Sequence, residues 1–341
     1  MRWHELDSDM SHLWDEMLAE FRALGGTADN ICLKDGRFGR GLFPRDPPKP
    51  IKVHIPESLL IDVEHLEFEN YNLRVGPKSP AGAREKVFLE RYEREFSWGV
   101  GREHTEAILK MFQGAPAGLR EILEAPPLSV GWWLADPNPK SIAERYFGSR
   151  AIEYHGRRVI MPIVELANHG EATQYEIGNG IGLSGRFGDE ILVRYELACD
   201  SLNIFSDWGF ASPEDAAFSL PMRLEKSGIG IHRETVKSEP GRPPLFPRVS
   251  VAGGRITFPH LLLGHKKYPR LARGIFYRIM RDAGRKDVEE TFDMIQHVNR
   301  MQFHKLEAAS EDAPPTLGRL LREVARHQLE AMSHNIGTRE I

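Results

Sequence analysis

Cysteine and long apolar runs are scarce in this sequence. Its 341 residues include only two cysteines, Cys32 and Cys199, which are too few for a disulfide framework or a thiolate metal site. No segment reaches the ~20 consecutive apolar residues that a membrane helix needs. The acidic N-terminal stretch "MRWHELDSDMSHLWDE" also lacks the apolar core of a signal peptide. We therefore expect a cytoplasmic chain with no membrane partner.

A basic excess and the usual metal motifs are missing as well. Lysine and arginine number 45 against 49 acidic residues, a formal net charge of -4, whereas a dedicated nucleic-acid binder normally carries a basic excess. HExxH, CxxC and nucleophile-elbow sequences do not occur. We expect no nucleic-acid partner and no metal. We interpret the local basic cluster "GHKKYPRLARG" at 264–274 as a solvated helix face.

What the sequence does contain is an alternation of β-rich and helical stretches. Apolar residues at helical spacing predict a helix over 8–24 that ends at Gly25-Gly26. The glycines and prolines that follow favour two short strands around a glycine turn. Later patterns predict an α+β fold class in four parts: an N-terminal helix with the first part of a β-rich domain (1–53), a helical insert (54–145), the second part of the β-rich domain (146–212), and a mainly helical C-terminal domain (213–341).

Two glycine-rich stretches invite a ligand-binding interpretation. "EIGNGIG" at 176–182 matches the turn of Rossmann-type methyltransferases, but that turn needs a helix after it. Here a second turn and a strand pattern follow, so we predict a hairpin. "DGRFGRGLF" at 35–43 lacks the Gly-Lys-Ser/Thr ending of a phosphate loop. It is either a plain glycine turn, or Gly39 and Gly41 let the backbone approach a ligand closely.

Four short motifs follow one another across the two β-rich parts. They are "GRGLF" at 39–43, Ser149-Arg150, "MPIVELANH" at 161–169, and "GDEILVRYELACDSLNIFSDWGF" at 188–210. Each is weak alone, but their order and spacing resemble the SET-domain protein methyltransferases. More narrowly, they resemble the branch that includes the plant Rubisco large-subunit lysine methyltransferase and the animal enzyme that methylates an actin histidine. The resemblance covers roughly residues 8–212.

This resemblance implies a SET fold in which the Asn-His segment is threaded through a loop in a knot-like way. It also implies S-adenosylmethionine as cofactor, with Arg150 on its carboxylate, Asn168 at its polar end and His169 holding the adenine through its backbone. Tyr195 would be the catalytic tyrosine. The full set of implied cofactor-binding residues is Gly39, Arg40, Gly41, Leu42, Ser149, Arg150, Asn168, His169, Tyr195 and Phe210.

The implied function is S-adenosylmethionine-dependent N-methylation of a protein substrate, with a lysine side chain as the leading acceptor. Tyr195 and Trp208 would line the acceptor pocket, and the C-terminal domain (213–341) would help to recognise the protein substrate. Three positions depart from the family pattern: Trp208 replaces a second tyrosine, Ser201 an asparagine, and Glu165 an aspartate. A histidine methyltransferase of the same fold and a SET-like scaffold that has lost activity therefore stay open. So does the oligomeric state, a monomer included.

Overall fold

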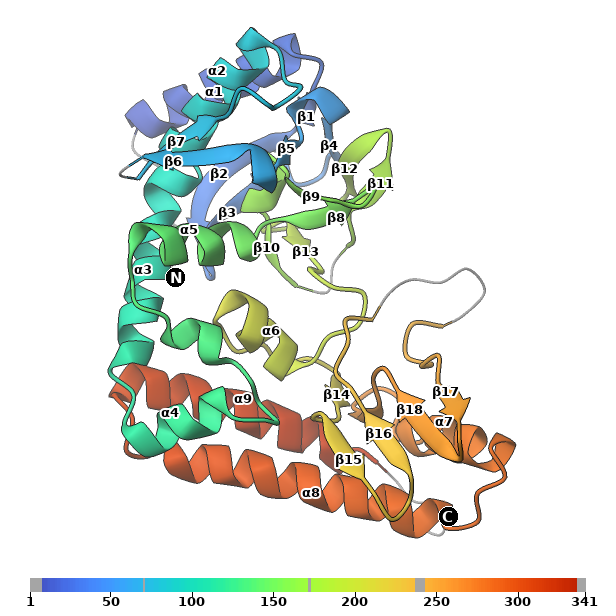
Figure 1. The fold of residues 1–341 in the computed structure, drawn as a ribbon. Helices are drawn as coiled ribbons and strands as arrows, with labels where there is room; N and C mark the ends of the chain where they lie inside the picture. The colour runs from blue at the N-terminus through green and yellow to red at the C-terminus, as the bar shows by residue number, and fades with distance from the viewer. Residues whose placement is uncertain (1–7, 70, 171–172, 237–242, 336–341) are drawn as a thin grey trace. The chain divides into compact units, whose positions relative to one another are not determined.

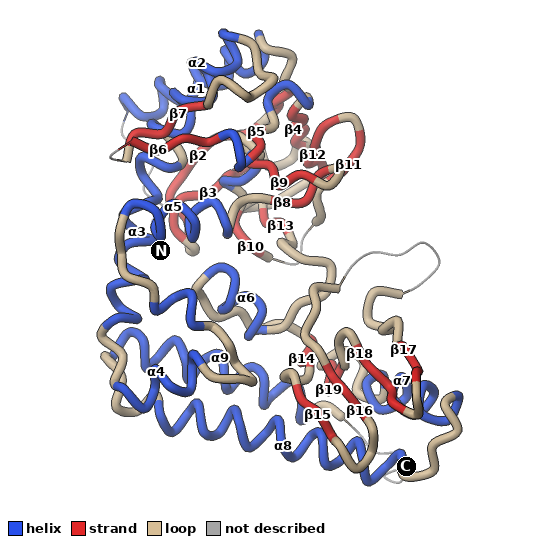
Figure 2. The backbone as a smooth tube through the Cα atoms, viewed as in Figure 1, coloured by secondary structure: helices blue, strands red, loops and turns tan. Residues whose placement is uncertain are grey.

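The computed structural model describes residues 8–69, 71–170, 173–236 and 243–335 (Figure 1). The chain forms two compact units. The first comprises Met1–Glu106 and Pro137–Tyr195, and the second comprises Ala107–Asp136 and Glu196–Ile341. Short strands and helices alternate along both units, which confirms the α+β fold class (Figure 2). Among the described residues, no helix has the length and apolarity to cross a membrane.

The first unit opens with helix α1, Ser8–Ala23, as its sequence pattern predicts. Trp14, Met17, Leu18 and Phe21 recur at spacings of three and four residues and are buried on one face of α1. The helix ends at Gly25, whose φ of +91° lies in the left-handed region that glycine adopts without steric cost. The apolar face therefore fixes α1 on the core of this unit.

Small sheets make up most of the rest of the first unit. The predicted hairpin forms between β2, Ile31–Gly36, and β3, Gly39–Pro44. A four-stranded sheet has the order β1-β4-β12-β11, and the other pairings are β5-β9-β8, β6-β7 and β10-β13. These strands span β1 Thr27–Asp29, β4 Ile51–Ile55, β5 Ile61–Asp62, β6 Leu66–Glu69, β7 Asn72–Val75, β8 Ile152–Tyr154, β9 Arg157–Ile160, β10 Asn168–His169, β11 Glu176–Gly178, β12 Gly180–Gly185 and β13 Leu192–Val193; three 3-10 turns span η1 Glu57–Leu59, η2 Val63–His65 and η4 Val164–Leu166.

The "EIGNGIG" stretch is a hairpin, as predicted. β11 and β12 are antiparallel, and Gly180, the first residue of β12, has a φ of +96°. A Cβ at Gly180 would lie 2.1 Å from the carbonyl oxygen of Ile55, so only glycine fits beside β4. Residues 186–195, which follow β12, form no helix. The helix that a Rossmann-type turn requires after its glycines is therefore missing from these residues.

The predicted insert at 54–145 begins with strands and becomes helical only at Ala83. Its helices are α2 Ala83–Glu95, α3 Trp98–Gln113, α4 Ala117–Glu124 and α5 Pro139–Gly148, with a 3-10 turn η3 Gly131–Leu134. The division between the two units falls inside α3. The four domain borders expected from the sequence stay a prediction. The strands at the start of the predicted insert have two to five residues, and such strands are too short to show a clear alternation of apolar and polar residues.

The second unit contains two sheets before its last helices. Its sheet orders are β14-β19 and β15-β16-β18-β17. The elements span α6 Ser201–Trp208, β14 Ala216–Phe218, β15 Met222–Leu224, β16 Ile229–Ile231, β17 Ser250–Ala252, β18 Arg255–Phe258, β19 Leu262–His265, α7 Leu271–Asp282, α8 Val288–Ala309 and α9 Pro315–Ser333. Helices α7 to α9 confirm the predicted helical end of the chain, and the strands at 216–265 are an addition to it.

Candidate functional site

Three of the four sequence motifs meet in the first unit, beside strand β3. Asn168 Nδ2 donates hydrogen bonds to Glu190 Oε1 at 2.5 Å and to the Arg40 carbonyl oxygen at 3.3 Å. The Ile191 amide donates to the Leu42 carbonyl oxygen at 2.8 Å. The "GRGLF", Asn-His and "GDE" motifs are therefore in direct contact, although more than a hundred residues separate the first from the others.

Glycine is required at position 41 because two side chains approach its backbone closely, and not because of its backbone angles. A Cβ there would lie 2.5 Å from Glu190 Oε1 and 2.6 Å from Asn168 Nδ2, while the φ of Gly41 lies outside the left-handed region. Gly39, in the turn, has a φ of +95° and open space where its Cβ would be. At Gly39 the structure shows a turn residue, and at Gly41 it shows close approach of two protein side chains. Close approach of a ligand to this backbone stays a prediction.

The Asn-His segment is strand β10, which pairs with β13 in parallel. Asn168 lies opposite Leu192, and His169 lies opposite Val193. Two residues further on, the Tyr195 amide donates to His169 Nδ1 at 3.4 Å. The hydrogen bonds of both strands thus hold Tyr195 beside the Asn-His segment. The knot-like threading of this segment stays a prediction.

The Tyr195 hydroxyl is placed to donate rather than to act as a base. Its Oη donates to the Ala167 carbonyl oxygen at 3.1 Å. Burial raises the pKa of Tyr195 to about 12, against the opposing effect of the Arg150 charge. The phenol therefore keeps its proton throughout the neutral range, and with that proton donated to Ala167 its oxygen can accept a hydrogen bond from a ligand.

Helix α5 positions Ser149-Arg150 at its C-terminal end. Asn138 caps the start of α5, since its Oδ1 accepts hydrogen bonds from the Lys140 and Ser141 amides at 3.1 Å. The Arg150 guanidinium stacks over the Tyr146 ring at 3.8 Å, and its Nη1 donates to Ser149 Oγ at 3.1 Å. With 30% of its side chain exposed, Arg150 is rigidly held and still accessible to a ligand.

The carboxyl groups of Glu165 and Glu93 are both buried near the Arg150 guanidinium. Glu165 Oε2 lies 4.0 Å from Arg150 Nε, and Glu165 Oε1 accepts a hydrogen bond from the Tyr92 hydroxyl at 3.0 Å. Glu93, from α2, is 0% exposed, and its Oε2 accepts from the Trp98 amide at 3.4 Å. Burial and the Glu165 charge raise the pKa of Glu93, and burial raises that of Glu165 despite Arg150. At neutral pH the pair therefore holds a proton more readily than exposed glutamates do.

Glu93 and Glu190 were not singled out from the sequence. Glu93 follows Phe88, Leu89 and Tyr92 on the buried face of α2, and a carboxylate at a core position of an amphipathic helix is the signal that would have found it. Glu190 belongs to the noted "GDE" motif, but its contact with Asn168 depends on the turn between β12 and β13. Sequence spacing alone does not give that geometry.

We expect Glu93→Gln to remove part of the pH dependence of stability. Folding raises the pKa of the Glu93 carboxyl group above its ordinary value of 4.5. The protonated carboxyl group therefore favours the folded state fully below pH 4.5, and this contribution to the free energy of unfolding is lost as the pH rises through the folded pKa. The neutral amide can still accept from the Trp98 amide. Urea unfolding at about pH 8 should therefore show the variant to be more stable than the wild type, with the difference shrinking toward pH 4.5. Parallel pH profiles of variant and wild type would contradict the buried-pair assignment.

Trp208, Phe210 and Ser201 belong to the second unit. Trp208 is the last residue of α6, and Gly209 ends that helix with a φ of +78°. Phe210 is 36% exposed, and Ser201 Oγ lies 3.5 Å from His327 Nδ1. The structure therefore gives these residues local roles at α6. Their place beside the residues of the first unit stays a prediction.

No protein-family model and no curated protein sequence matches this chain. Solved structures do resemble it, and three of them each match 96% of this chain and 90% of the other. They are the SET domain of LSMT bound to lysine and AdoHcy (13% identity, TM-score 0.44), Rubisco LSMT bound to sinefungin and monomethyllysine (14%, 0.41), and Rubisco LSMT bound to AdoMet (12%, 0.45).

Proposed function

We propose that this chain is an S-adenosylmethionine-dependent protein N-methyltransferase with a lysine side chain as its leading acceptor. The observation that carries the proposal is the contact of Gly41, Asn168 and Glu190, which come from three separate motifs. A residue larger than glycine at position 41 would clash with the side chains of the other two. The order of these motifs resembles the SET-domain methyltransferases. Three unrelated turns would not be expected to place their side chains around the same glycine.

The residues present fit the proposed cofactor. Arg150 is a partly exposed guanidinium, which suits the carboxylate of the methionine part because a planar fork can donate two parallel hydrogen bonds. Asn168 and the main chain of β3 at Arg40 would hold the polar end, and His169 the adenine. S-adenosylmethionine would supply an electrophilic methyl group on its sulfonium. The protein would contribute alignment, which is worth about 7–11 kcal/mol in favourable geometry.

Tyr195 would act on the acceptor nitrogen. Its hydroxyl keeps its proton because burial raises its pKa to about 12, so it cannot remove the proton from a lysine at neutral pH. Its oxygen can instead accept a hydrogen bond from the N–H of the neutral amine, which orients the nitrogen lone pair and faces the positive charge that develops on the nitrogen. The lysine would have to arrive without that proton. An apolar channel beside a sulfonium charge lowers the amine pKa by desolvation and like-charge repulsion.

The departures from the family pattern bear on the acceptor. Glu165 lies 4.0 Å from Arg150 and bonds to Tyr92, so the longer acid still contacts the cation. Trp208 changes the size and polarity of the acceptor pocket, and the histidine-methylating branch also lacks a tyrosine at this position. Histidine is therefore the second candidate acceptor. The substrate would be a protein, and a cytoplasmic location belongs to the same proposal.

Calorimetric titration with S-adenosylmethionine and S-adenosylhomocysteine tests the cofactor first. We expect both to bind the purified chain at about micromolar Kd, and Asn168→Ala to weaken binding at least about tenfold, which corresponds to about 1.4 kcal/mol. Asn72→Ala is the matched control, because Asn72 is exposed on β7 and lies outside the site. If folded protein free of carried-over cofactor gives neither heat nor thermal stabilisation, the scaffold alternative replaces this proposal.

A further inference from the structure

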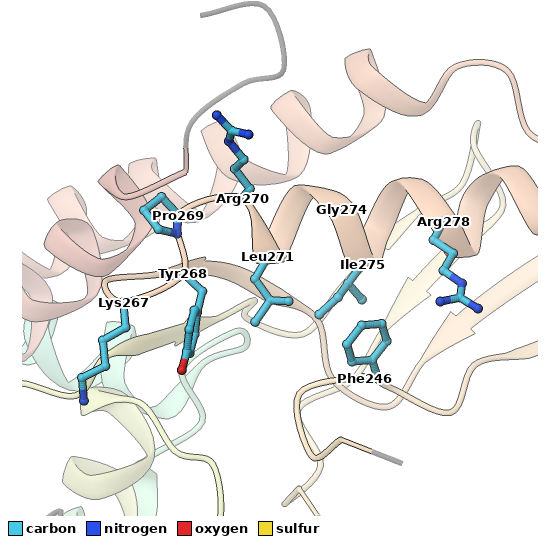
Figure 3. A pocket seen from close by; sticks show the side chains of 9 residues that line it. All are labelled: Phe246, Lys267, Tyr268, Pro269, Arg270, Leu271, Gly274, Ile275 and Arg278. Carbon is cyan, nitrogen blue, oxygen red and sulfur yellow. The ribbon is translucent and has the colours of Figure 1, made fainter. Parts of the chain in front are cut away.

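A groove of about 700 Å³ lies at the start of helix α7 in the second unit. Figure 3 shows Leu271 and Ile275 extending from one face of α7 toward Phe246, with Tyr268 facing the same space from the preceding loop. Tyr268 is 59% exposed. The groove thus has the size of a small ligand site and an apolar lining, and neither the sequence motifs nor the proposed methyl transfer uses it.

Gly274 leaves the middle of α7 bare at this groove. It lies three residues after Leu271 and four before Arg278, so the three share one helix face. A Cβ at Gly274 would meet nothing within 4 Å, and its φ lies outside the left-handed region. Neither packing nor backbone geometry requires glycine here, although it destabilises a helix interior by about 1 kcal/mol relative to alanine. The glycine does let another chain approach the helix backbone closely.

The surroundings of the groove are strongly basic in a chain of net charge -4. Residues 266–286 contain eight lysines and arginines and one acid. Within the described part of the chain, ion pairs neutralise half of the eight: Lys266 with Glu330, Lys267 with Asp215, Arg273 with Asp293 and Arg285 with Asp287. Arg278 is exposed, has no acidic partner among the described residues, and borders the groove beside Phe246 (Figure 3). The rim of the groove is therefore cationic and its lining apolar.

We propose that this groove docks an acidic segment of a partner protein. One aliphatic or aromatic side chain of the segment packs between Leu271, Ile275 and Phe246 and approaches the helix at Gly274, while neighbouring carboxylates face Arg278. A nucleic acid fits less well, because ion pairs already neutralise half of the local cations and phosphate binding needs many free ones. This docking does not depend on the proposed methyl transfer.

Gly274→Leu separates groove binding from folding. Because the Cβ meets no atom within 4 Å and leucine is a strong helix former, this variant should fold and be at least as stable as the wild type. Its side chain would occupy the groove. The probe is a fluorescein-labelled peptide of glutamates and serines with one central phenylalanine, titrated with the full chain and followed by anisotropy. We expect Gly274→Leu to weaken binding at least about tenfold.

Charge reversal tests the cationic rim. Arg278→Glu should weaken binding of the acidic peptide about tenfold, and Arg319→Glu, an exposed reversal on α9, should not. A peptide with alanine at its centre should bind the wild type about as weakly as the phenylalanine peptide binds Gly274→Leu. Equal affinity of the wild type and Gly274→Leu would overturn the proposal. It would also be overturned if only RNA or anionic vesicles bound, or if Gly274→Leu abolished self-association instead.

Discussion

Gly41→Ala is expected to abolish S-adenosylmethionine binding while the first unit stays folded. The new methyl group would lie 2.5 Å from Glu190 Oε1 and 2.6 Å from Asn168 Nδ2, and both of these atoms end flexible side chains that can move aside. The fold would then lose only about 1–2 kcal/mol, as small overpacking changes do. Asn168 would leave its position, and we expect cofactor affinity to fall at least about a hundredfold, or about 2.7 kcal/mol.

Gly188→Ala provides the matched control for this experiment. Gly188 precedes Asp189 and Glu190 in the same turn, yet a Cβ there meets nothing within 4 Å and its φ is not positive. Calorimetry should find wild-type affinity in Gly188→Ala and no detectable heat in Gly41→Ala, while Gly41→Ala should melt only a few degrees below Gly188→Ala. Normal affinity in Gly41→Ala would remove the β3 cradle from the proposed cofactor site.

Tyr195→Phe is expected to lower methyl transfer about 10²–10³-fold without changing cofactor affinity. Loss of one preorganised hydrogen-bonding group at the reacting atoms typically has this effect on kcat, and here the group lost is the phenol oxygen that would accept from the acceptor amine. The hydroxyl also donates to the Ala167 carbonyl oxygen, so stability should fall by about 1 kcal/mol. Transfer can be followed as radioactive methyl from S-adenosylmethionine into lysate proteins that the wild type labels.

Tyr154→Phe separates lost stability from lost chemistry. The Tyr154 hydroxyl accepts a hydrogen bond from the buried Gly180 amide at 2.9 Å, and removing it should cost about 1–3 kcal/mol. Methyl transfer should nevertheless stay near the wild-type rate, because Tyr154 lies outside the proposed site. If Tyr195→Phe turned over like the wild type, or if Tyr154→Phe lost as much activity, Tyr195 would have no catalytic role.

Local features of this fold follow from the sequence, because neighbouring residues alone determine them. Helix α1 follows from the spacing of its apolar residues, and the β2–β3 and β11–β12 hairpins follow from their glycines. The absence of a helix pattern after Gly182 was enough to reject a Rossmann-type turn. In each case the deciding interactions lie within a few residues along the chain.

The contacts that build the candidate site depend on distant segments. Glu190 meets Asn168 across 22 residues and both meet β3, while Glu93 joins Glu165 from a helix 72 residues earlier. Motif order predicted that Gly41, Asn168 and Tyr195 belong together. It did not predict that Glu190 fills the space over Gly41, or that two acids would share one cation. These facts depend on side-chain directions that only the folded chain sets.

The strand pairing of the first unit determines how late in synthesis its four-stranded sheet can be completed. β4 pairs with β1 on one side and with β12 on the other, and the chain between β4 and β12 includes a segment that belongs to the second unit. A growing chain that has reached residue 136 therefore exposes β4 as an unpaired edge, a form prone to intermolecular association. Translation must continue through Gly185 before that edge can close, so slow synthesis between these points would favour aggregation of the nascent protein.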